Sequence, residues 1–353
     1  MSARLATALF ALLTALAEPA PAADARAAVV RALPFLETHG VAWIRDRGCT
    51  SCHQTTFLVW AHNQANRRGV PVDAVKLDGW TSWAMLSVVT SEDQGLGQGA
   101  DTLSQLLIGR DPAAALTAKP AKGSRNFDPY ENVLRTLLKS QAADGHWTAG
   151  GQSRNPPDAP TGWALHAIAL RQKWMAGPKL NPAAGAADAL KKLIKANDDA
   201  IPAARDRALA FLQKSKEDPA ADLTEQLVTR LLVEIGYGTP ARITERTDAL
   251  LARQNPDGGW SASPKLKRPS DAYATGHAIY TLSLAGRPPT DPAIKHATAF
   301  LLITQSADGS WPVPSTAFHP GEKPTRADRT TVIYSYWGTA WATIGLLQSL
   351  PTK

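Results

Sequence analysis

Apolar side chains recur at helical spacing in separate stretches of the chain. One stretch lies at 133–138, another at 250–251 and a third at 300–302, and an Asp-Gly turn signal follows each of them. After each turn a second run of small and apolar residues begins, at Thr161, Thr275 or Gly338. This alternation predicts pairs of helices joined by short turns, which is the pattern of a helical hairpin.

The three turns share one motif, Q-x-x-D-G-x-W. The copies are Gln141 to Trp147, Gln254 to Trp260 and Gln305 to Trp311. Weaker copies of the hairpin fill the gaps between them. They lie at 207–212 with 223–235, at 73–89 with 99–108, and at 39–44 with 55–62, the last within a first hairpin spanning 31–69.

Six such hairpins cannot bury their apolar faces singly, so we expect them to stack around one continuous core. An open solenoid and a closed ring both satisfy this pattern. The Q-x-x-D-G-x-W copies resemble the QW motifs of squalene–hopene cyclases and their relatives, whose fold protein prenyltransferase β subunits share. The resemblance implies an all-α protein, an α/α toroid, in which the Gln, Gly and Trp tie adjacent hairpins together.

The catalytic groups of those enzymes do not recur here. No D-x-D-D cluster occurs, and no cysteine follows Cys52 to complete a prenyltransferase-like zinc site. The acidic pair Asp198-Asp199 is expected in a polar linker. We therefore name no catalytic residue and leave open whether the chain is an enzyme.

The start of the chain predicts export. Met1–Arg4 is basic, Leu5–Leu16 is an apolar run and Ala20-Pro21-Ala22 offers small residues for cleavage, so 1–22 is interpreted as a signal peptide. The mature chain, 23–353, is expected as a single toroid domain that is secreted or periplasmic, with no membrane span. The formal net charge is +7, but the basic residues are scattered, which argues against nucleic acid as a partner.

The only two cysteines fall in a C-x-x-C-H motif, Cys49-Thr50-Ser51-Cys52-His53. This spacing is typical of covalent haem c attachment, with two thioethers from the cysteines and His53 bound to the iron. Aligned with the other hairpins, the motif replaces the QW turn of the first repeat. We expect one haem c held by these residues. A local disulfide, a redox dithiol and half of a zinc site remain as alternatives.

The sixth iron ligand is left between two candidates. His319 lies in the long turn 312–328 of the last hairpin, which abuts the first hairpin in a closed ring. Met85 is the alternative, although its apolar helical surroundings also suit a core residue.

These observations predict a periplasmic c-type haem protein with a redox or electron-transfer role and an unidentified redox partner. Two alternatives stay open. One is a cyclase-like protein that holds an apolar, isoprenoid-like molecule in the ring cavity, and the other is a non-redox scaffold with a Cys49–Cys52 disulfide. Two further sets of residues can be either structural or part of a cavity. Asp158, Asp271 and Asp328 are helix caps or rim acids. The aromatic residues of the second helices are core or cavity lining: Trp163, His166, His277, Tyr280, Tyr334, Tyr336 and Trp341.

Overall fold

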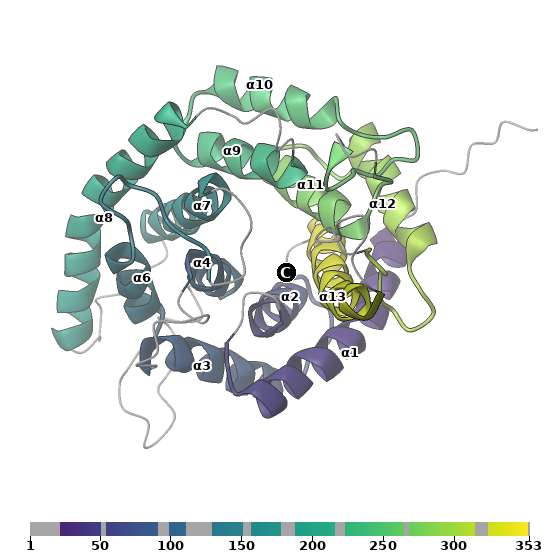
Figure 1. Ribbon diagram of the computed structural model, residues 1–353, viewed down its shortest axis with the longest axis horizontal. Helices are drawn as coiled ribbons and strands as arrows, with labels where there is room; N and C mark the ends of the chain where they lie inside the picture. Colours follow the sequence, from purple (N-terminus) through teal and green to yellow (C-terminus); the bar gives the residue numbers. More distant parts are fainter. Residues whose placement is uncertain are drawn as a thin grey trace, which may run out of the picture.

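Helices follow one another in outer and inner pairs, and the pairs close into a ring (Figure 1). The computed structural model describes residues 22–50, 54–90, 99–110, 129–150, 157–177, 188–215, 223–264, 268–314 and 324–351. Within these ranges it holds twelve helices, and β-structure is limited to one isolated bridge between Trp260 and Asp271. The predicted all-α class and the α/α toroid are confirmed.

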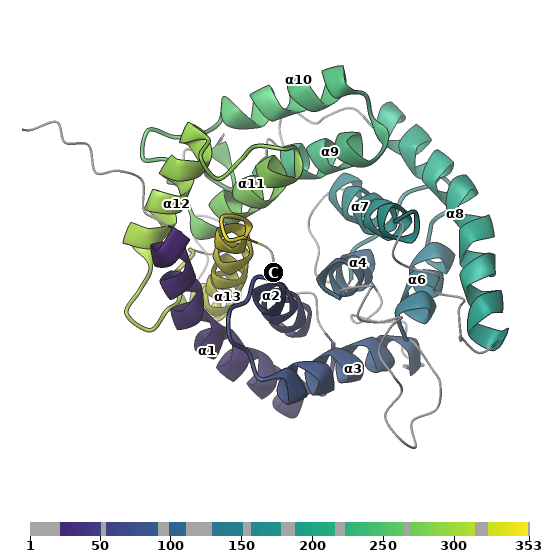
Figure 2. The same cartoon turned by 180° about the vertical axis from the view of Figure 1, so that it is seen from behind.

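The helices form two concentric layers, and Figure 2 shows the same arrangement from behind. The outer helices are α1 (Ala22–Arg47), α3 (Ala74–Thr90), α6 (Pro129–Lys139), α8 (Asp188–Lys214), α10 (Pro240–Leu251) and α12 (Pro292–Thr304). The inner helices are α2 (Thr55–Arg67), α4 (Ala100–Gly109), α7 (Asp158–Met175), α9 (Thr224–Tyr237), α11 (Ala272–Leu284) and α13 (Pro324–Gln348).

Local sequence fixes where several helices begin. Thr239 precedes α10 and Asp291 precedes α12, and each side chain accepts a hydrogen bond from a backbone N–H of the first turn. A proline follows each of these caps, where its missing N–H costs nothing and its fixed φ suits the first turn. The starts of these two outer helices are therefore specified by their local sequence.

The QW turns act as clamps between neighbouring hairpins. The side chains of Gln141, Gln254 and Gln305 each donate one hydrogen bond to the glycine carbonyl of their own turn. Each also donates to a carbonyl of the next outer helix, at Ala204, Ala293 and Ala28 respectively, over 2.8–2.9 Å. The clamp at Gln305 joins the last hairpin to the first and so closes the ring.

The motif tryptophan and glycine complete each clamp. The indole N–H of Trp311 donates to Leu301 O, and the same bond recurs at Trp147 and Trp260. Gly309 has φ +85°, and a Cβ there would lie 2.0 Å from Arg31 O on α1. Only glycine allows that backbone conformation and that approach. The motif therefore serves to dock one hairpin on the next.

Ring closure has a second bond at Tyr336 on α13. Its hydroxyl lies 3.1 Å from the carbonyl oxygens of Leu36 on α1 and Gln54 before α2, and both accept from it. Tyr336 is fully buried, and burial raises its pKa above the ordinary tyrosine value. One phenol thus joins three elements from the two ends of the chain.

Aromatic side chains fill the middle of the ring. Trp60, Trp163 and Trp341 come from α2, α7 and α13, are at most 5% exposed, and have ring centroids 5.0–6.3 Å apart. Edge and tilted contacts of this kind add to the stabilisation that burial gives. In this layer the inner aromatic residues are core.

The acidic pair Asp198-Asp199 does not lie in a linker, as the sequence led us to expect, but inside α8. Asp198 pairs with Arg171 of α7, whose guanidinium also binds the fully buried Glu131 of α6 over 3.1–3.2 Å. Asn197 donates to Glu131 as well. The polar stretch is therefore a helix whose charges satisfy a buried ion pair.

No helix in the described part of the chain combines the length and the apolar character that a membrane crossing needs.

Candidate functional site at the mouth of the ring

The inner helices all begin at one end of the ring. Each outer helix runs into its turn and the turn leads into the inner helix, so the six inner helices are parallel. Contacts between equivalent positions agree with this direction, because Trp60, Trp163 and His277 are each the sixth residue of an inner helix and form one layer. We call the end where the inner helices start the mouth.

A carboxylate and three aromatic rings lie together at the mouth. Glu225 begins the first turn of α9, and its two oxygens accept from the indole N–H of Trp163 (3.1 Å) and the hydroxyl of Tyr273 (3.2 Å). The ring of Tyr273 lies 6.0 Å from that of Trp337, which lies 5.0 Å from Tyr334. We call these four residues the mouth cluster: Glu225, Tyr273, Tyr334 and Trp337.

The members of the mouth cluster are only partly buried, unlike the aromatic layer beneath them. Below, His277 stacks on Trp341 with centroids 3.7 Å apart, and its Nδ1 bonds to Tyr273 O. One layer deeper, His166 Nε2 is 2.9 Å from the hydroxyl of Tyr280. Among the described residues, the mouth cluster is thus the layer of the stack nearest the mouth.

Burial shifts the pKa values of titratable side chains at and below the mouth, and neighbouring acids add to the shift of Tyr273. Burial raises the pKa of Tyr273 well above its ordinary value, and the charges of Glu225 and Asp271 raise it further. Tyr273 is therefore a neutral hydrogen-bond donor to Glu225. Burial lowers the pKa of both His166 and His277 to about 3, so both imidazoles are neutral near pH 7.

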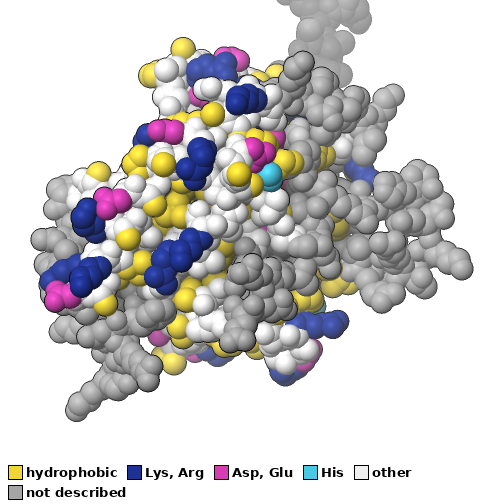
Figure 3. Space-filling view, turned by 60° about the vertical axis from the view of Figure 1, so that its left-hand side comes forward, with side chains coloured by type: hydrophobic (Ala, Val, Ile, Leu, Met, Phe, Trp, Pro, Cys, Tyr) yellow, Lys and Arg dark blue, Asp and Glu magenta, His cyan; other side chains and the backbone are white. Residues whose placement is uncertain are grey.

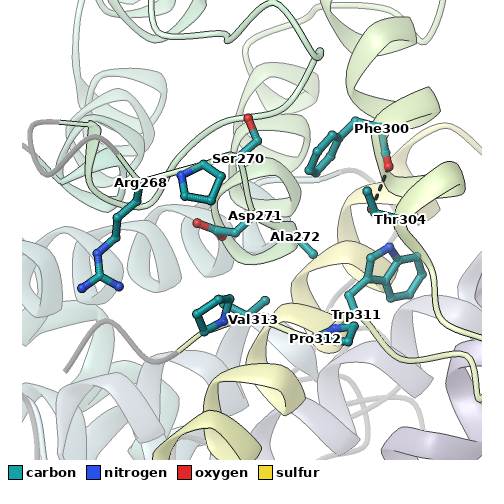
Figure 4. Close-up of a pocket in the computed structure, with 11 residues that line it drawn as sticks. Arg268, Ser270, Asp271, Ala272, Phe300, Thr304, Trp311, Pro312 and Val313 are labelled. Carbon is teal, nitrogen blue, oxygen red and sulfur yellow. Dashed lines mark hydrogen bonds between the residues drawn. The ribbon is translucent and has the colours of Figure 1, made fainter. Parts of the chain in front are cut away.

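A pocket with a volume of about 170 Å³ opens beside the start of α11 (Figure 4). Its walls come from the start of α11, the end of α12 and the chain after the third QW turn. The carboxyl group of Asp271 lies in the middle of the lining residues, between Arg268 on one side and Phe300 and Trp311 on the other (Figure 4). The pocket is therefore largely apolar, with one acid and one base.

Asp271 serves α11 as a cap. One oxygen accepts from Ala274 N (2.8 Å) and the other from Ala262 N (2.9 Å), and burial raises the pKa of the carboxyl group. The capping role that the sequence offered for Asp271 is confirmed. Asp158 instead lies in the first turn of α7 and pairs with Arg230 and Ser215. Both acids are satisfied by protein groups.

The first two residues of the C-x-x-C-H motif, Cys49 and Thr50, lie at the mouth, because they follow the end of α1. Cys49 is half-buried, while Cys52 and His53, like His319, lie outside the described residues. Thr50 is buried, and its hydroxyl contacts Ala84 O (3.3 Å) and Ser87 Oγ on α3. Thr50 thus bonds to the next outer helix, as the motif Gln does in the three hairpins that carry the QW motif.

Among the described residues, the space beside Gly48, just before the motif, is open. Gly48 has φ +59°, and no atom lies within 4 Å of the position where its Cβ would be. Met85 on α3 lies in the hydrophobic core, with 1% of its surface exposed. In the described residues no three His, Cys, Asp or Glu side chains come together as a metal-holding group. Thioether attachment of haem at Cys49 and Cys52, with His53 as iron ligand, stays a prediction that these residues do not test.

Glu225 is the site residue that sequence reasoning missed. It lies in one of the three hairpins that lack the QW motif, and a single glutamate at a helix start is common as a partner of the helix dipole. Its equivalence to Asp158 and Asp271, at the start of successive inner helices, is the one signal in the sequence that points to it. Tyr273 and Trp337 were missed as well.

Comparison with known proteins gives little beyond the fold. No family model and no curated protein matches the chain. Two solved structures to which it is similar are described as possible members of the GH105 family. The one from Salmonella enterica is 13% identical and the match covers 92% of this chain and 82% of that one, with a TM-score of 0.36. The one from Klebsiella pneumoniae is 14% identical, and the match covers 93% of this chain and 81% of that one, with a TM-score of 0.37.

These findings contradict two expectations from the sequence. The resemblance to squalene–hopene cyclases and prenyltransferases is wrong as a family assignment, since the matching structures carry the GH105 description instead. The predicted role as a haem redox protein is contradicted by the same matches. The cyclase-like and disulfide-scaffold alternatives fit these matches no better. The physical reason lies in the QW motif itself. Its Gln and Gly dock one hairpin on the next and its Trp anchors the turn to its own outer helix, so the motif specifies a ring and carries no information about chemistry.

Proposed function

We propose that the chain binds a carbohydrate at the mouth of the ring, on the mouth cluster. The observation that carries the proposal is Glu225, a carboxylate fixed by Trp163 and Tyr273 in the same cluster as partly exposed aromatic rings. A sugar offers apolar C–H faces that pack on aromatic rings, and hydroxyl groups that donate to a carboxylate. Sites for small polar molecules commonly combine such rings with a few fixed polar groups.

The contrast between the mouth and the deeper layers supports this placement. Trp60, Trp341 and His277 are fully enclosed and their rings contact one another, so they have no face left for a ligand. Tyr334 and Trp337 retain exposed surface. Apolar surface that gathers in one place often marks a binding site.

We propose binding only, and we assign Asp271 no role as a proton donor. Both oxygens of Asp271 accept backbone N–H groups, so its carboxyl group is already used at the start of α11. The proposal rests on the mouth cluster alone.

Binding is tested by titrating the purified protein with a panel of neutral, amino and uronic oligosaccharides, followed by calorimetry. We expect at least one class to bind. Glu225→Gln keeps the shape but removes the charge, and we expect it to weaken binding about tenfold, the effect of losing about 1.4 kcal/mol from a hydrogen bond to a charged group.

The matched control is Glu245→Gln, which alters an exposed glutamate on outer helix α10 whose partner is Arg242. It should leave binding unchanged. Absence of binding across the whole panel, or equal loss in the two variants, would refute the proposal.

A further inference from the structure

We infer that the pocket beside the start of α11 binds a second sugar unit of the carbohydrate held at the mouth. This inference rests on the proposed function and extends it from the mouth cluster to a neighbouring subsite. The ligand is then an oligosaccharide of at least two units, and a hydroxyl group of its second unit bonds to the carboxyl group of Asp271.

The pocket adjoins the mouth cluster along two paths. On α11, Asp271 lies two residues before Tyr273, and its charge acts on the pKa of the Tyr273 phenol. On the other side, Val313 of the pocket wall donates its backbone N–H to Ser335 Oγ over 3.1 Å, and Ser335 directly follows Tyr334. A ligand that extends from the mouth cluster over the start of α11 therefore reaches the pocket.

The volume of the pocket suits a single sugar ring. Pockets that enclose a drug-sized ligand measure about 300–1,000 Å³, whereas this one measures about 170 Å³. That volume is also several times the ~30 Å³ that one water molecule takes in the liquid. All of its lining residues belong to the described part of the chain. The pocket is thus too small for a whole oligosaccharide and fits one unit of it.

The carboxyl group of Asp271 keeps one position for a ligand hydroxyl. Backbone N–H groups of Ala262, Tyr273 and Ala274 bond to it, and an ionised carboxylate accepts about four hydrogen bonds. The group lies in the middle of the lining residues (Figure 4). Asp271 therefore accepts from a sugar hydroxyl while it still caps α11.

Apolar side chains line the same pocket. Phe300 and Val313 lie above and below the carboxyl group of Asp271 in Figure 4. Pro312 and Pro314, which are exposed, extend this apolar lining. Sites for small polar molecules commonly combine apolar walls with a few fixed polar groups. A sugar unit matches both, because it carries hydroxyl groups beside apolar C–H faces.

The outer side of the ring over α8 differs from the mouth. Two exposed ion pairs join neighbouring turns of this helix: Lys191 with Asp188, and Lys195 with Asp199. The space-filling view shows basic and acidic side chains mixed on this side of the molecule (Figure 3). The charged groups of α8 thus bond to one another, and we place the second sugar unit in the pocket and not along this side.

The inference is tested by calorimetry with three series of sugars, each from one to four units long: β-linked glucose, N-acetylglucosamine and galacturonic acid. In a series that binds, we expect the affinity to rise about tenfold at one step, the effect of one added hydrogen bond to a charged group. Beyond that step the affinity should level off, because the pocket holds one ring.

A variant that fills the pocket tests where the added unit lies. Thr304 is exposed at the end of α12 and lines the pocket, so Thr304→Phe should reduce the tenfold step to less than about threefold. The matched control is Ile303→Phe, which adds a ring at the preceding residue. Ile303 is 81% exposed and is not part of the pocket lining, so the step should remain. Thermal melting checks that both variants are folded.

Equal affinities along every series that binds, or a step that persists in Thr304→Phe, would overturn this inference and leave the proposed function standing. Equal loss of the step in Thr304→Phe and Ile303→Phe would overturn it as well. If no member of any series binds and the wider panel is also negative, the proposed function itself fails.

Discussion

Glycine at the QW turns shows how much one residue contributes to the ring. Gly309 and Gly286 have nearly the same backbone conformation, with φ +85° and +89°. They differ in their surroundings, because a Cβ on Gly309 would meet Arg31 O and Ala32 N, whereas one on Gly286 would meet no atom within 4 Å. The pair therefore separates backbone strain from the contact that closes the ring.

Alanine at these two positions should have unequal effects on stability. Both Gly309→Ala and Gly286→Ala pay about 1 kcal/mol for the left-handed conformation, and Gly309→Ala should cost a further ~2 kcal/mol from overpacking. Chemical unfolding of the two variants measures the difference. Equal destabilisation would show that the close approach to α1 is not maintained in solution.

Buried histidines make the ring sensitive to acid. His166 and His277 have folded-state pKa values of about 3, below the unfolded value near 6.5. The unfolded chain therefore binds more protons, and stability falls as the pH drops from about 6.5 towards 3. Each histidine should cost about 1.4 kcal/mol per pH unit in that window.

The histidine effect is read from the pH dependence of the unfolding free energy between pH 7 and 4.5. His277→Gln should flatten the slope by about one proton relative to the unaltered chain, and the raised pKa of Asp271 is common to both proteins. His296→Gln, on the outer helix α12, is the control. An unchanged slope in His277→Gln would show that this imidazole is protonated or solvated in the folded protein.

At the scale of the element, the hairpin is what the sequence predicts best. Three hairpins follow from Gln, Gly and Trp at fixed spacing, and the structure shows why. The Gln side chain bonds to the next outer helix, the Gly backbone approaches that helix closely, and the Trp indole bonds to the outer helix of its own hairpin. The other three were found from weaker patterns and are present as helix pairs. The length of α8 was missed because its Asp198-Asp199 pair reads as a linker until Arg171 is known to face it.

Thr50 should act as the clamp of the first hairpin. Thr50→Val keeps the shape of the side chain but removes both contacts with α3, so we expect a loss of about 1 kcal/mol in the free energy of unfolding. Thr90→Val, which removes a hydroxyl bonded within an exposed turn of α3, is the control and should change stability little. If the two variants are equally stable, the segment before α2 is not held by α3.

At the scale of the whole molecule, the sequence predicted a ring but not its site. The ring follows from repeated motifs, whereas the mouth cluster joins Glu225 of α9, Tyr273 of α11 and Trp337 of α13. These residues come together only because six parallel helices start at one end. Cys49 and Thr50, which begin the C-x-x-C-H motif, lie at that end, and the chemistry of the motif is a separate question from the ring.

Haem attachment at Cys49 and Cys52 remains a prediction. An absorption spectrum of the mature protein, from a host with a haem c maturation system, should show covalent haem that is lost in Cys49→Ala/Cys52→Ala. A colourless product under these conditions would show that the motif is an ordinary thiol pair. Either result leaves the binding proposal unchanged, because the mouth cluster contains neither cysteine.

The most direct test of the central claim is a crystal structure of the protein with its tightest-binding oligosaccharide. We expect a sugar ring packed on Tyr334 or Trp337, with a donor group of the sugar bonded to the carboxylate of Glu225. A well-ordered oligosaccharide bound elsewhere on the molecule, with the mouth cluster free of it, would contradict the account.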